Sequence, residues 1–166
     1  MTPLYHKDCR ALLSAVEVIH GTPSLEHFSS RALAAVKKIL SCNTICYNEV
    51  TLPASMTSWI TEPAGAMPGP LLRGAFMRNL PEHPVLGRFL QRDCPSLKIS
   101  DFLSREQFHK LALYNEYYRK IGVEYQLLAA ISTGRRQSVG LGLDRDRLDY
   151  SDVECLRLDL LRPHLV

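Results

Sequence analysis

The order of strand-like and helix-like segments constrains the fold of this chain more than any other feature. Strand-like segments, rich in β-branched and aromatic residues, come in two pairs, and a short turn separates the members of each pair. The pairs are Thr44–Leu52 with Met56–Thr61, and Val123–Ser132 with Gln137–Leu143. Two such runs joined by a short turn predict an antiparallel hairpin. Because strands and helices do not alternate strictly, the pattern argues against a doubly wound parallel sheet. It favours an α+β fold, with helices packed on an antiparallel sheet.

Amphipathic helices precede and follow the two hairpins. Apolar side chains recur at helical spacing in residues 4–20, and a second helix is expected from Thr22 to about Leu40. Ser151 and Glu154 form a capping box that begins a last helix. Shorter helical segments are expected at 71–80, 84–91, 104–114 and 115–121, and a short extended segment at 97–100. One domain spanning residues 1–166 accommodates all of these elements.

Charge and cysteine usage narrow the functional class. The 166 residues carry 20 Lys and Arg against 17 Asp and Glu, a net charge of +3. The charges are interspersed, without the basic stripe that marks a nucleic-acid-binding surface. The five cysteines are irregularly spaced, no signal peptide precedes the first helix, and no apolar stretch approaches the ~20 residues of a membrane helix. We therefore expect a cytoplasmic protein with reduced thiols and no membrane association.

Two glycines interrupt the last strand-like segment. Gly140 and Gly142 alternate there with Val139, Leu141 and Leu143. Glycine inside a strand is typical of a bend or of a place where another group approaches the backbone closely. We expect one of these at this strand.

The second half of the chain carries three distinctive segments, HPVLGRFLQR (83–92), KISDFLSREQFHKLALYNEYYRKIGVEYQL (98–127) and YSDVECLRLDLLRPHLV (150–166). They resemble the sensor half of bacterial LuxR-type transcriptional regulators, in the subgroup whose N-terminal part is a GAF-like domain. The matching positions are Asp101, Phe102, Ser104, Phe108, Tyr114, Tyr118, Gly122, Tyr125 and 161–165. Residues 1–70 fit the resemblance by architecture alone.

The resemblance implies a fold, a function and partners. The fold would be GAF-like and PAS-related, with a central antiparallel sheet flanked by helices. The domain would sense a small-molecule effector, form a homodimer, and pass a signal through its C-terminal helix to a DNA-binding helix-turn-helix head. That head is expected C-terminal to residue 166 and is absent from this chain, so DNA would be contacted only through it. The chain is then a truncated sensor half or a natural single-domain relative, and no cofactor is implied.

The resemblance also places a small ligand between the sheet and its flanking helices, in a concave apolar pocket with a few polar groups. Aromatic residues suit such a pocket, since a tyrosine ring packs while its hydroxyl makes a hydrogen bond. The candidate ligand-binding residues are Trp59, Phe102, Phe108, His109, Tyr114, Tyr118 and Tyr125. Plain core packing is the competing interpretation, because an aromatic stripe at helical spacing is commonly the buried face of a helix.

The first and last helices are the expected dimer interface, because the resemblance implies dimerisation through them. Leu12 and Val16 lie on the apolar face of the first helix, and Leu156 and Leu160 on that of the last. Packing of both helices within one monomer is the alternative.

Two other functions stay open from the sequence. One is a purely structural dimerisation module with a filled core. The other is a small GAF-fold thiol enzyme, similar to methionine sulfoxide reductases, that would use Cys42, Cys46 or Cys94. We expect no enzyme, since the sequence contains no Ser-His-Asp, phosphate-binding glycine or His-Glu-x-x-His motif. We also expect no metal site, since the spacing of His83, Cys94 and His109 matches no compact metal-binding motif.

Overall fold

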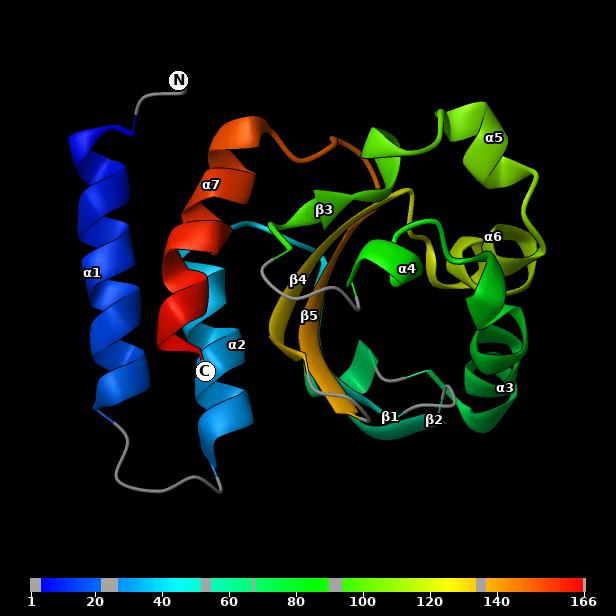
Figure 1. Cartoon of the computed structure of the whole chain (residues 1–166), viewed down its shortest axis with the longest axis horizontal. Coiled ribbons are helices and arrows are strands. Elements are labelled where there is room, and N and C mark those ends of the chain that lie inside the picture. Colours follow the sequence, from blue (N-terminus) through cyan, green and yellow to red (C-terminus); the bar gives the residue numbers. More distant parts are fainter. Residues whose placement is uncertain are drawn as a thin grey trace.

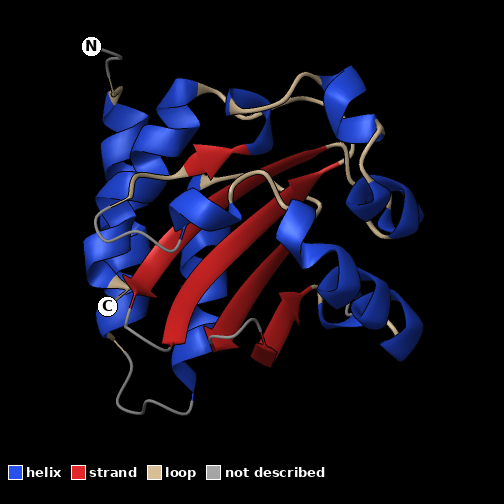
Figure 2. Ribbon diagram, turned by 45° about the vertical axis from the view of Figure 1, so that its right-hand side comes forward, coloured by secondary structure: helices blue, strands red, loops and turns tan. Residues whose placement is uncertain are grey.

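A curved antiparallel sheet organises the fold (Figure 2). The computed structural model describes residues 4–21, 27–51, 55–66, 68–89, 94–133 and 137–165. Within these residues the sheet has five strands, β1 (Thr44–Thr51), β2 (Ser55–Glu62), β3 (Leu97–Lys98), β4 (Tyr125–Thr133) and β5 (Gln137–Arg145). Their order is β2-β1-β5-β4-β3, and every neighbouring pair is antiparallel. Both predicted hairpins and the α+β class are therefore confirmed.

Three longer helices form a layer on one face of the sheet (Figure 1). They are α1 (His6–His20), α2 (Phe28–Ile39) and α7 (Asp152–Leu161), which a 3-10 turn at Arg162–His164 follows. The helices α2 and α7 contact strands β1 and β4, whereas α1 packs on α2 and α7. The core beneath this layer includes Val36, Ile45, Leu127, Leu141, Leu143 and Leu158, all buried.

Shorter elements cover the opposite face, toward which the sheet is concave (Figure 1). They are α3 (Pro70–Asn79), α4 (Leu86–Phe89), α5 (Arg105–His109) and α6 (Ala112–Glu116), with 3-10 turns at 64–66, 80–82, 99–101 and 118–121. They enclose a second apolar core, separate from the first, which includes Phe76, Leu80, Val85, Phe89, Phe108, Leu113, Tyr114, Tyr117 and Tyr118.

The alternation of side chains along the strands decides which residues reach this concave face. Successive side chains of a strand point to opposite faces of the sheet. On β1, Ile45 and Tyr47 join the core under the helix layer, so Cys46 lies on the concave face. On β5, Leu143 joins the same core, and Asp144 lies on the concave face, where it lines a cavity. The concave face is therefore the more polar of the two.

The glycines of β5 accommodate a close approach, as the sequence predicts. A Cβ atom at Gly140 would lie 2.1 Å from Cζ of Phe89, and one at Gly142 would lie 2.9 Å from Sγ of Cys46. The Phe89 ring of α4 thus rests directly on the backbone of β5. These glycines let the short elements of the concave side pack closely on the sheet.

The prediction of one helix over residues 104–114 is wrong, because two short helices, α5 and α6, lie there. The chain leaves helical geometry at Leu111, whose ψ of 144° is extended. The Asn115 side-chain amide donates to the carbonyl oxygens of His109 and Leu111, at 2.8 and 2.9 Å. The His109 carbonyl at the end of α5 thereby gains a partner, whereas the Leu111 carbonyl also accepts the backbone N–H of Asn115. Local side-chain bonds of this kind compete with helix continuation.

Other element ends differ from expectation by a few residues. The first helix begins at His6, because the Asp8 carboxylate accepts the Tyr5 N–H at 2.9 Å. Helix α4 spans Leu86–Phe89, and residues 90–91 of the expected helix lie outside the described part of the chain. The extended segment near residue 97 is two residues long before a 3-10 turn. The capping box of Ser151 is confirmed. Residues 22–26 and 134–136 lie outside the described part of the chain.

Across the described ranges, we find no helix with both the length and the apolar character needed to span a membrane.

Candidate functional site

A small cavity lies between the concave face of the sheet and the elements that cover it. Its volume is about 130 Å³. The sheet contributes its polar lining, and the covering elements contribute most of its apolar lining. The lining residues are Thr44, Cys46, Trp59, Thr61, Ala66, Pro68, Tyr117, Ile121, Val123 and Asp144.

Asp144 is the most unusual side chain of this cavity. It is buried, with 6% of its surface exposed, and its Oδ1 accepts a hydrogen bond from Nε2 of Gln126 at 2.8 Å. Burial raises the pKa of this carboxyl to about 7. The nearby Cys46, Tyr117 and Tyr118 also have pKa values raised by burial, so they are neutral at physiological pH. Among the described residues, Asp144 has no ion-pair partner.

A buried hydrogen-bond network holds Asp144 from behind. Nδ1 of His83 accepts the Val85 N–H at 3.3 Å, so the ring proton lies on Nε2, which is 3.0 Å from Oε1 of Gln126. The Tyr118 hydroxyl donates to the same Oε1 at 2.9 Å. Burial lowers the pKa of His83 to about 4, which keeps the ring neutral. Because both groups donate to Oε1, the Gln126 amide is fixed with its N–H₂ toward Asp144.

Two further polar groups at the cavity are not satisfied. Nε1 of Trp59 and Oγ1 of Thr61 are buried, and neither has a hydrogen-bond partner within the described residues. Leaving a buried polar group unpaired costs free energy, so such groups are rare in folded proteins and call for an explanation. A bound molecule in the cavity would supply the missing partners.

A second cavity, about 50 Å³, lies further along the same face and is mostly apolar. Its lining residues are Asn48, Val50, Phe76, Leu80, His83, Leu86, Phe89 and Leu128. It shares His83 with the network that supports Asp144, so the two cavities are connected through buried side chains.

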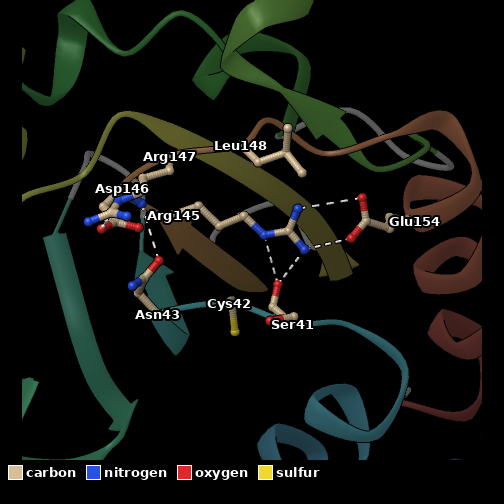
Figure 3. A pocket seen from close by; sticks show the side chains of 8 residues that line it. All are labelled: Ser41, Cys42, Asn43, Arg145, Asp146, Arg147, Leu148 and Glu154. Carbon is tan, nitrogen blue, oxygen red and sulfur yellow. Dashed lines mark hydrogen bonds and ion pairs between the residues drawn. The ribbon is translucent and has the colours of Figure 1, made fainter.

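A larger hollow, about 420 Å³, lies at the surface where β5 ends (Figure 3). The positively charged residue at its centre, Arg145, already has partners within the protein. The Arg145 guanidinium donates to the Ser41 carbonyl oxygen from Nε at 2.8 Å, pairs through Nη2 with Oε1 of Glu154 at 2.5 Å, and lies 3.9 Å from the centre of the Tyr150 ring. Arg145 therefore ties the sheet to α7, and we regard the smaller, less open cavity as the better binding site.

The predicted ligand-binding residues fall into several environments. Trp59 lines the cavity, and Tyr118 supports it from the buried network. Phe108 and Tyr114 lie in the apolar core beside them. His109 stacks on Tyr114 with ring centres 4.1 Å apart.

The remaining candidates lie further from the cavity. His109 and Tyr114 both bind the carboxylate of Glu124, at 2.7 and 2.5 Å. Phe102 is 38% exposed, and Tyr125 begins β4 opposite Arg145. The structure thus brings together only part of the aromatic set, and ligand contact by any of these residues stays a prediction.

Sequence reasoning missed the polar cavity residues Thr61 and Asp144, and it missed Gln126, which supports Asp144 from behind. One signal for Asp144 was present in the sequence. This residue follows Gly140 and Gly142 at a spacing of two residues, so its side chain lies on the same face of the strand as these glycines. The pattern does not show that α6 and the neighbouring turns bury this face.

The cysteines do not support thiol chemistry. All five are free, and burial raises the pKa of Cys42 to about 11 and that of Cys46 to about 12. The pKa of Cys94 is also raised by burial. Since the thiolate is the nucleophile, these shifts disfavour reactivity at neutral pH. Within the ranges the structure describes, no group of three or more His, Cys, Asp or Glu side chains is arranged to hold a metal ion.

Replacing Asp144 with asparagine should stabilise the domain at alkaline pH. Between the unfolded-state pKa near 3.8 and the folded-state pKa of about 7, the folded chain retains a proton that the unfolded chain has released, so stability falls as the pH rises. An asparagine at this position does not titrate, so the variant has no such loss. We expect Asp144→Asn to raise the free energy of unfolding by roughly 4 kcal/mol at pH 8 and by little at pH 4.

Urea unfolding at both pH values measures this difference. Asp146→Asn, at the exposed position two residues on, serves as the control and should show no such pH-dependent gain. Equal effects of the Asp144 substitution at pH 4 and pH 8 would show that this carboxyl does not titrate abnormally.

The fold described above is that of the ligand-binding domains of LuxR-family transcriptional regulators. One similar structure is the ligand-binding domain of VqsR from Pseudomonas aeruginosa, with a TM-score of 0.61 and 16% identity over 95% of this chain and 89% of that one. Another is CepR2 from Burkholderia cenocepacia, an N-acylhomoserine lactone-dependent LuxR-family transcription factor, with a TM-score of 0.62 and 13% identity over 95% and 90%. No protein-family profile and no curated protein sequence matches the chain.

These structures confirm the resemblance at the level of the fold, and a sensor domain of a LuxR-type regulator fits it. The relation to GAF and PAS domains stays a prediction.

Proposed function

We propose that the chain is the effector-binding domain of a LuxR-type transcriptional regulator, acting in the cytoplasm and not as an enzyme. One observation carries the proposal. The concave face encloses a cavity with a buried carboxylate and two unsatisfied polar groups, in a fold shared with two ligand-binding domains. Most buried polar groups in folded proteins are hydrogen-bonded, so unpaired groups that line a cavity support a bound molecule there.

The effector signal would leave the cavity through strand β5. Asp144 lines the cavity, and its neighbour Arg145 points to the other face, where it pairs with Glu154 near the start of α7 (Figure 3). An effector that shifts Asp144 would therefore act on the contact between the sheet and α7. A DNA-binding head that follows α7 would respond to this change. The effector can shift the equilibrium between two conformations of the domain by no more than the difference in its binding free energy to the two. DNA would be contacted only through that head.

The domain would act as a homodimer through α1 and α7. Leu12 and Val16 are partly buried against the core, Leu156 is half-buried, and Leu160 is 45% exposed. On α1, Leu13 is 66% exposed. Exposed leucines on both outer helices give a second copy an apolar surface to cover.

Leu160→Glu should weaken this dimer at least about tenfold, since it places a charge in an apolar interface. Sedimentation equilibrium measures the dissociation constant, and Leu71→Glu, at an 88% exposed position of α3 on the opposite side of the sheet, is the control. A monomeric wild type, or equal dissociation constants for wild type and Leu160→Glu, would exclude this interface.

A thermal-shift screen of small metabolites and N-acylhomoserine lactones against the full chain tests the sensor function. A compound that binds only the folded state raises the melting temperature by mass action. We expect at least one compound to do so, with slower hydrogen exchange in α7. Absence of any stabilising compound would favour the structural module instead.

A further inference from the structure

We propose that the 130 Å³ cavity binds a small organic cation, an ammonium compound that carries an oxygen acceptor close to its charge. This inference rests on the proposed sensor function and names the chemical class of its effector. Three features of the cavity carry it, namely an uncompensated carboxylate, aromatic walls, and unsatisfied donors.

Among the residues that the structure describes, the carboxylate of Asp144 lacks a positive partner. Buried charges in proteins are normally paired, because the desolvation cost is otherwise uncompensated. The adjacent Arg145 cannot serve, since its guanidinium lies on the opposite face and is held by Ser41 and Glu154. The titratable groups that surround Asp144 are all neutral at physiological pH and are Cys42, Cys46, Tyr117, Tyr118 and Tyr150. Burial raises the pKa of Asp144 to about 7, and a cation in the cavity would stabilise its ionised form.

Aromatic rings form part of the cavity wall. Trp59 and Tyr117 both line it, with ring centres 6.2 Å apart, and Phe76 packs against both. Aromatic rings attract organic cations through their quadrupole, tryptophan most strongly. The combination of such rings with a carboxylate favours an ammonium group over a neutral one.

The unsatisfied groups require an acceptor on the same molecule. Nε1 of Trp59 can only donate a hydrogen bond, and Oγ1 of Thr61 can donate one as well. A carbonyl or hydroxyl oxygen beside the ammonium would accept from them. The ligand must also be compact, because an engineered cavity of ~150 Å³ holds one benzene molecule, so about six non-hydrogen atoms fit here.

A matched pair of probes tests the class of ligand. Glycinamide carries an ammonium next to a carbonyl, and glycolamide replaces that ammonium with a hydroxyl at nearly the same size. We expect glycinamide to bind the full chain at least about tenfold more tightly than glycolamide near neutral pH, since hydrogen bonds to charged groups are the stronger ones. Calorimetric titration measures both dissociation constants.

Asp144→Asn should abolish this preference, so that the two probes bind with similar affinity, whereas Asp146→Asn should retain it. The urea unfolding of Asp144→Asn proposed above would show independently that the variant is folded. Equal binding of the two probes to the wild type, or a preference that survives in Asp144→Asn, would overturn the inference.

A third probe separates this inference from the sensor function itself. N-butanoyl-homoserine lactone is neutral and larger. If it binds and glycinamide does not, the chain is a sensor of a neutral ligand, and only the cation assignment fails. If none of the three probes binds, the cation assignment fails as well, and the wider metabolite screen decides on the sensor function.

Discussion

Replacing Arg157 with methionine is expected to destabilise the domain by about 4 kcal/mol and to loosen α1 from the rest of the helix layer. Nη2 of Arg157, on α7, lies 2.7 Å from Oδ1 of Asp8, on α1, and Nη1 donates to the Ile39 carbonyl oxygen at 3.4 Å. Asp8 is only 4% exposed. Methionine keeps the apolar length of the side chain but leaves a buried carboxylate without a counter-ion.

Urea unfolding measures the loss, and Arg10→Met, at an exposed position of α1, is the control for the change in charge. Adding Asp8→Asn to Arg157→Met should restore part of the stability, because the uncompensated charge is then gone. A loss in Arg157→Met no larger than that in the control would mean that the ion pair contributes little.

Arg145→Met is expected to cost about 3 kcal/mol and to free the first turn of α7 from the sheet. Arg145 is buried and joins three parts of the chain, since it bonds the Ser41 carbonyl and pairs with Glu154 (Figure 3). Its guanidinium also stacks on the ring of Tyr150. Without it, the Glu154 carboxylate loses its cation, although it still accepts hydrogen bonds from Ser151.

Hydrogen exchange resolves where Arg145→Met acts. Exchange should accelerate in residues 151–161 by more than elsewhere, and the melting temperature should fall by roughly 8 °C. Arg147→Met, whose wild-type side chain is 90% exposed, should change neither quantity. Uniform acceleration across the sheet would contradict a local role for Arg145 and would weaken the proposed path from the cavity to α7.

The order of the elements could be predicted from the sequence because it depends on local patterns. The β-branched runs and their turns are visible in short windows, and the Ser151 capping box marks the start of α7 without tertiary information. The break between α5 and α6 could not be predicted, because it depends on the hydrogen bond from the Asn115 side chain to the His109 carbonyl at the end of α5.

The lining of the cavity could not be predicted from the sequence, for a physical reason. Thr61, Tyr117 and Asp144 come from β2, from the end of α6 and from β5, and only the folded sheet brings them together. An aspartate in a strand is usually exposed, and its burial here follows from the elements packed over the concave face. The aromatic candidates were visible as a cluster, but Phe102 lies at the surface and Phe108 in the core.

The fluorescence of Trp59 during an effector titration tests the central claim most directly. The chain contains a single tryptophan, and it lines the proposed binding cavity. A compound that stabilises the domain should change the tryptophan emission in a saturable titration whose dissociation constant equals that from calorimetry. A stabilising compound that saturates the protein and leaves the emission unchanged would place the effector site elsewhere.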